Sequence, residues 1–117
     1  MIASIKIGPV TYRVVEMTDT HMIGASSDGS GRAVSLNGAI TYHDLTISVA
    51  QSNAPEMKLV TLWHEAVHGI LKAAGQDHSE NVVEALGFGL VALIRDNPEL
   101  VDLTRKLGDG QQIAGQS

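Results

Sequence analysis

Hydrophobic and polar positions divide the chain into a β-like first part and a helical second part. Residues 4–7 and 11–17 carry β-branched residues in partial alternation with polar ones, and Gly8-Pro9 between them is typical of a turn. The alternation returns over residues 39–49, which we expect to be extended. Its apolar positions are Leu45, Ile47 and Val49. The first part therefore predicts short strands.

Two stretches between these strands carry turn chemistry. Residues 20–32 are rich in Gly and Ser at their centre and predict a loop, and residues 33–36 predict one more short strand. Asn37-Gly38 predicts a hairpin turn, because both residue types tolerate a positive φ. We therefore expect a small twisted N-terminal sheet of about three to four strands.

After Ser52 the hydrophobic residues recur at the spacing of a helix. Asn53-Ala54-Pro55-Glu56 offers a capping residue, an early proline and an acid in the first turn. An apolar stripe at 3.6-residue spacing follows from Leu59 to Ala74, and Gly75 is a natural stop. This predicts one long amphipathic helix over the middle of the chain.

Two further helices are predicted after Gly75. The second begins near Asp77 or Ser79 and runs to about Asp96, and the third follows Asn97-Pro98-Glu99 and ends at Gly108. A sheet followed by three helices is an α+β layout. We expect one domain over residues 1–108 and a flexible tail over 109–117, which is rich in Gly and Gln.

Composition narrows the possible chemistry. The 117 residues carry a net charge of −5, so we expect no nucleic-acid partner. No uncharged stretch is long enough to cross a membrane, and the first residues lack the apolar run of a secretory signal. The chain has five histidines and no cysteine, which excludes a zinc finger, an iron–sulfur cluster and a thiol nucleophile. A bound metal must therefore take His, Asp or Glu ligands.

Residues 64–68 read His-Glu-Ala-Val-His in the middle of the long predicted helix. Histidines at i and i+4 project from one face about one turn apart, so His64 and His68 can reach one zinc ion. Both border the apolar stripe, and Glu65 lies just beyond them on the polar side. This placement predicts Glu65 as a general base that acts on a zinc-activated water.

Two histidines leave a catalytic zinc one protein ligand short. The candidates on the next helix are His78, Glu80 and Glu84. Glu80 and Glu84 are i, i+4 neighbours on one face, so both can look towards the first helix. His78 beside Asp77 and Ser79 is also typical of a polar helix start. The residues themselves leave these alternatives open.

The chain resembles a minimal gluzincin, and it is most similar to the ImmA/IrrE-type metallopeptidases and small phage-encoded zincins. The resemblance rests on residues 64–68 with the Leu-Trp before them and on residues 84–89, which read Glu-Ala-Leu-Gly-Phe-Gly. It implies Glu84 as the third zinc ligand and Glu80 as a neighbouring acid. Leu86 departs from the pattern, where an Asn is usual. The resemblance implies a zincin-like fold and a cytoplasmic peptidase of bacterial or phage origin that acts on a protein or peptide.

Tyr42 and His43 lie near the strand that precedes the metal helix, where a Tyr or His can contact the substrate or stabilise an oxyanion. A half-exposed strand pair explains them equally well. The sequence thus predicts a zinc peptidase whose extended substrate adds to the sheet edge. The alternative is a regulatory or interaction module in which zinc staples two helices with little turnover.

Overall fold

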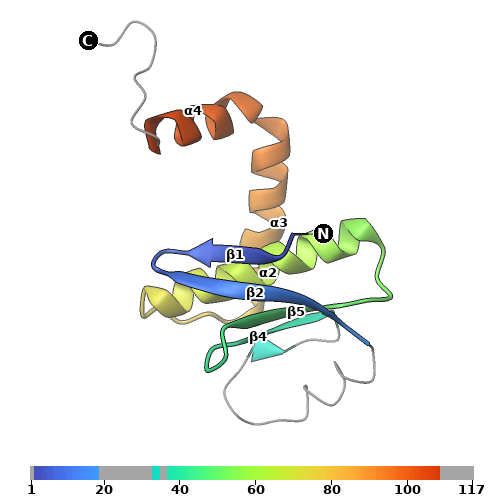
Figure 1. Ribbon diagram of the computed structural model, residues 1–117. Coiled ribbons are helices and arrows are strands. Elements are labelled where there is room, and N and C mark those ends of the chain that lie inside the picture. The colour runs from blue at the N-terminus through green and yellow to red at the C-terminus, as the bar shows by residue number, and fades with distance from the viewer. Residues whose placement is uncertain (1, 19–32, 35–36, 109–117) are drawn as a thin grey trace, which may run out of the picture.

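The computed structural model describes residues 2–18, 33–34 and 37–108 as a sheet covered on one face by a long helix, with two further helices leading away (Figure 1). The elements in chain order are β1 (Ser4–Ile7), β2 (Val10–Met17), β3 (Ala33–Val34), β4 (Gly38–Thr41), β5 (Thr46–Ala50), α2 (Pro55–Ala73), α3 (Glu80–Asp96) and α4 (Pro98–Gly108). The α+β class predicted from the pattern is confirmed.

The described strands form one mixed sheet in the order β1-β2-β5-β4-β3. The β2–β5 pair is parallel, and the other pairs are antiparallel. The two-residue β3 lies outside β4, where it pairs with Ala39 and Ile40. At Ala39 and Ile40, β4 is therefore paired on both sides, with β3 and with β5.

One face of the sheet packs on α2 and forms the core. Ile47 of β5 is in register with Val14 of β2 on one side and Ile40 of β4 on the other. Ile40 and Ile47 are fully buried, and each such side chain contributes about 1.5–3 kcal/mol on burial. The remaining core residues are Ile7, Tyr12, Val49, Leu62 and Ala66. This core holds the middle of α2, which carries the histidines, in a fixed place.

One prediction in the strand region is wrong. Residues 39–49 are not one extended stretch, because β4 ends at Thr41 and a turn that includes Leu45 with φ 54° leads into β5. Asn37 lies in the hairpin connection between the antiparallel strands β3 and β4, as predicted, and Gly38 is already the first residue of β4. A Cβ at Gly38 would overlap Thr61 Cγ2 and lie 2.9 Å from the carbonyl oxygen of Ser48. The glycine is required here by the close approach of β4 to α2.

The predicted helices are present, with small differences at their starts. The residue before α2 is Ala54, whose side chain makes no capping bond, whereas the Asn53 amide donates to Asn37 Oδ1 at 3.0 Å. Ser79 caps α3 by accepting from the Val82 amide. Between the helices Gly75 has φ +69°, a conformation that suits glycine at the end of a helix. Residues 76–79 then connect α2 to α3.

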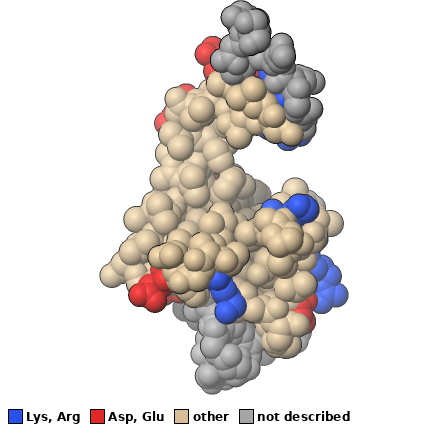
Figure 2. Space-filling model, turned by 90° about the vertical axis from the view of Figure 1, so that its left-hand side faces the viewer, with Lys and Arg blue, Asp and Glu red and all other residues tan. Residues whose placement is uncertain are grey.

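The helices α3 and α4 form an arm that leads away from the sheet. α3 buries Val83, Gly87 and Val91, and α4 buries none of its residues. Arg95 of α3 donates two hydrogen bonds to the Glu56 carboxylate of α2, at 2.6 and 2.9 Å. Figure 2 shows the hollow between α4 and the rest of the molecule.

The predicted loop at 20–32 and the tail at 109–117 lie outside the described residues. None of the described helices has the length and apolarity needed to span a membrane.

Candidate metal centre

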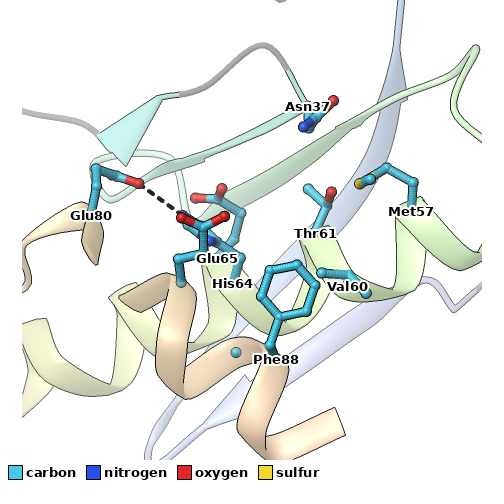
Figure 3. Close-up of a pocket in the computed structure, with 10 residues that line it drawn as sticks. Asn37, Met57, Val60, Thr61, His64, Glu65, Glu80 and Phe88 are labelled. Atoms are coloured by element: carbon cyan, nitrogen blue, oxygen red, sulfur yellow. Dashed lines mark hydrogen bonds and ion pairs between the residues drawn. The ribbon is translucent and has the colours of Figure 1, made fainter. Parts of the chain in front are cut away.

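Three side chains from α2 and the start of α3 converge on one point. His64 Nε2 lies 3.0 Å from Glu80 Oε2, and His68 Nε2 lies 2.9 Å from Glu80 Oε1. The two imidazoles are close, with ring centroids 5.1 Å apart. Each residue offers one ligand atom within 4.8 Å of the others, so His64, His68 and Glu80 form a group that can hold a metal ion. Figure 3 shows Glu80 reaching across to His64.

The geometry favours Glu80, the alternative third ligand, over Glu84. Among the described residues Glu84 is not a member of the converging group, although it lines the same pocket. The difference follows from the face that α3 turns to α2, which is defined by its buried residues Val83, Gly87 and Val91. At about 100° per residue, Glu80 lies about 20° from Gly87 around the helix and Glu84 about 60°.

The contact that sets this orientation is between Gly87 and His64. A Cβ at Gly87 would lie 3.4 Å from the His64 Cα and 3.5 Å from its backbone nitrogen. The backbones of α3 and α2 therefore meet beside the first metal-binding histidine. The sequence contained this signal, because positions 80, 83, 87 and 91 repeat at the spacing of one helix stripe.

His68 is held from both sides of its ring. Its side chain is only 2% exposed, and its Nδ1 lies 2.7 Å from Nδ1 of His78, which comes from the connection between the helices. Burial lowers the pKa of His68, and the neighbouring Glu80 charge opposes this effect only in part. A neutral imidazole is the form that binds a metal. The sequence had offered His78 as a ligand or as a polar helix start, and neither interpretation anticipated this contact.

Unpartnered buried atoms show that the residues fit a cation. His68 Nε2 lies 2.9 Å from Glu80 Oε1 but without the geometry of a hydrogen bond, and it has no hydrogen-bond partner in the described part of the chain. Leaving such a buried group unsatisfied costs about 1–3 kcal/mol, which coordination removes. Tetrahedral ligands at about 2.0–2.1 Å from zinc stand about 3.3 Å apart. The nitrogen–oxygen distances of 2.9 and 3.0 Å run to different oxygens of Glu80, and one ligand atom from each residue lies within 4.8 Å of the others, so small side-chain adjustments would bring the three ligands to this spacing.

Glu65 occupies a different environment from the one predicted. The apolar stripe predicts Glu65 on the polar side of the helix, but the residue is only 1% exposed. It lies under the start of β4, where a Cβ added at Gly38 would be 3.4 Å from Glu65 Oε2. Its Oε1 has no hydrogen-bond partner among the described residues. Burial raises the pKa of Glu65 well above its usual value, and the Glu80 charge raises it further. β4 covers the helix here, which the periodicity of α2 alone does not reveal.

A pocket of about 260 Å³ opens beside the three converging residues. Its polar lining residues include His64, Glu65, Glu80 and Glu84. Met57, Val60 and Phe88 add apolar side chains to its lining (Figure 3). A second groove of about 600 Å³ shares these three residues and continues between α2 and α3 to Arg95. The pocket therefore adjoins an open, mainly apolar groove.

Tyr42 and His43 lie in the turn after β4. The Tyr42 hydroxyl is buried without a hydrogen-bond partner among the described residues, and Lys72 lies 4.7 Å from the centre of its ring. Burial, with smaller contributions from Tyr12, Glu65 and Glu80, raises the pKa of Tyr42 to about 12. His43 is exposed. Neither residue lines the pocket beside the converging group in the described structure.

Compared with protein families, curated proteins and solved structures, the chain matches none.

Proposed function

We propose that this chain is a zinc-dependent peptidase of the gluzincin type, in which His64, His68 and Glu80 hold the metal and Glu65 is the general base. The observation that carries the proposal is the position of Glu65. Its carboxylate lines the same pocket as His64 and Glu80. A carboxylate beside two histidines and a third acidic ligand is the arrangement that metal-assisted hydrolysis requires.

Zinc fits this ligand set better than magnesium or calcium, because imidazole nitrogens suit zinc and hard cations prefer oxygen. When bound, zinc supplies an activated water and polarises the carbonyl of the scissile bond. Glu65 takes the proton of the attacking water and delivers it to the leaving amine nitrogen. Burial raises the pKa of Glu65, so its carboxylate holds a proton more readily than a carboxylate in water, as a general base must.

The substrate we propose is a protein or peptide segment that lies in the groove formed by α2 and α3. Strand addition to β4 is disfavoured, because β3 already pairs with the outer side of Ala39 and Ile40. The groove beside the site instead exposes Met57 and Phe88, which are 42% and 51% exposed. An apolar side chain of the substrate can cover this surface. The resemblance to phage-encoded zincins is the basis for proposing action in a bacterial or phage-infected cytoplasm.

The experiment that tests the proposal is the Glu65→Gln substitution. Wild type and the variant are each loaded with zinc and incubated with unfolded casein and a mixed peptide library, and new amino termini are quantified. Glu65→Gln keeps the shape of the side chain and lies outside the ligand set, so it retains zinc and loses hydrolysis. Glu84→Gln is the matched control, because it lines the same pocket and leaves both properties intact.

A zinc-stapled interaction module is the second candidate, and the small number of buried residues in α3 favours it. A metal that joins Glu80 to α2 would stabilise the contact between α2 and α3. In this case wild type binds zinc, cleaves nothing in either substrate set, and Glu65→Gln changes neither property. Cleavage by wild type that is lost in Glu65→Gln excludes this candidate.

A further inference from the structure

We propose that His78 is a positioning residue for the metal centre: it accepts a hydrogen bond from His68 Nδ1–H and so keeps the lone pair of His68 Nε2 directed at the metal. This inference deepens the proposed function and rests on its metal-binding part. The observation behind it is the 2.7 Å separation between the two Nδ1 atoms.

The distance requires one shared proton. Two ring nitrogens this close are hydrogen-bonded, so one of them carries the proton and the other offers a lone pair. The rings meet edge to face, with centroids 5.0 Å apart and an angle of 79° between their planes. Each ring can thus direct an Nδ1 at its neighbour without the rings stacking.

The direction of the bond follows from the other nitrogen of His68. Nε2 is the atom that lies beside Glu80, and it is buried without a hydrogen bond in the described structure. An imidazole binds a metal through a lone pair, so the proton of a neutral His68 must be on Nδ1. His78 Nδ1 is therefore the acceptor, and His78 carries its own proton on Nε2.

The connection between the helices places both partners of His68. The backbone amide of Gln76 donates to the Leu71 carbonyl at 2.9 Å, and at the other end Ser79 caps α3. His78 lies between these fixed points and Glu80 directly after them, and the two residues meet opposite nitrogens of the His68 ring. One short segment thereby supplies a metal ligand and the group that orients another ligand.

The test compares His78→Asn with His78→Leu. The side-chain oxygen of Asn lies near the place of His Nδ1 and can accept the same bond, whereas Leu cannot. Zinc affinity is measured by competition with a chromophoric chelator. We expect His78→Leu to weaken zinc binding about 10–100-fold and His78→Asn to restore most of the loss. His43→Leu, which alters an exposed histidine, serves as the control and leaves the affinity unchanged.

Two spectroscopic measurements separate positioning from general destabilisation. In ¹⁵N NMR of the zinc-loaded protein, His68 carries its proton on Nδ1, and this proton exchanges with solvent slowly in wild type and in His78→Asn and faster in His78→Leu. With Co²⁺ in place of zinc, all three proteins that bind the ion give the same visible absorption band, because His78 is not a ligand.

Three results would overturn the inference. Unchanged zinc affinity in His78→Leu means that the contact has no role. Equal losses in both variants together with an altered Co²⁺ spectrum make His78 a ligand. A His68 proton on Nε2 in the zinc-loaded wild type reverses the bond. None of these measurements uses hydrolysis, so a protein that shows the expected His78 dependence but cleaves no peptide refutes the proposed peptidase and leaves the inference standing.

Discussion

Gly87 of α3 lies against the backbone of His64 in α2, so closely that a Cβ at position 87 would be 3.4 Å from the His64 Cα. This contact fixes where α3 crosses α2. It also determines which side chain from the start of α3 reaches the histidines.

The first prediction tests this contact with the substitution Gly87→Leu. A larger side chain forces α3 away from α2, which we expect to cost about 1–3 kcal/mol and to weaken zinc binding. Gly89→Leu is the matched control, because no heavy atom lies within 4 Å of a Cβ there, and replacing a helical glycine gains up to about 1 kcal/mol. Urea unfolding and zinc titration measure both effects. Equal stability and affinity in the two variants would contradict the role of the contact.

The second prediction concerns the approach of β4 to α2 above Glu65. Gly38→Ala brings a methyl group against Thr61 Cγ2 and the carbonyl oxygen of Ser48, so we expect a loss of about 1–3 kcal/mol in the free energy of unfolding. Thr61→Ser removes one of these two atoms and should restore part of the loss in the double variant. A double-mutant cycle of unfolding free energies measures this coupling. Strictly additive effects would show that the two residues are not in contact.

Sequence reasoning predicted the α+β layout, the three helices and the pairing of His64 with His68, because all of these depend on local periodicity. It did not predict the surroundings of Glu65, since the burial of that side chain comes from β4, which is distant in the sequence. The choice between Glu80 and Glu84 depends on a rotation of about 40° around α3, which an i, i+4 argument does not resolve. The contact between His78 and His68 depends on the path of the chain through residues 76–79.

The third prediction is a pH dependence that comes from Glu65 in the metal-free protein. Burial raises its pKa above the usual 4.5, so the folded state favours the protonated form. The contribution of Glu65 to stability is complete below the usual pKa and is lost as the pH rises towards the raised value. Glu65→Gln does not ionise and avoids this loss.

Glu65→Gln should therefore become more stable than wild type as the pH rises from about 4.5 towards neutral, by at most about 1.4 kcal/mol for each pH unit in this window. Urea unfolding midpoints with a chelator present, recorded at steps between pH 4.5 and 7.5, measure the difference. If the two proteins lose or gain stability in parallel over this range, Glu65 is not held in its protonated form by burial.

The claim that Glu80 completes the metal centre with His64 and His68 is tested most directly by the zinc affinity of Glu80→Gln beside Glu84→Gln. The account predicts about one zinc per chain in wild type and in Glu84→Gln. It predicts that Glu80→Gln weakens zinc binding at least about 10–100-fold. Loss of a residue that only hydrogen-bonds to a metal ligand already costs this much, and Glu80 is itself a ligand. Tight binding by Glu80→Gln together with loss of zinc from Glu84→Gln would contradict it.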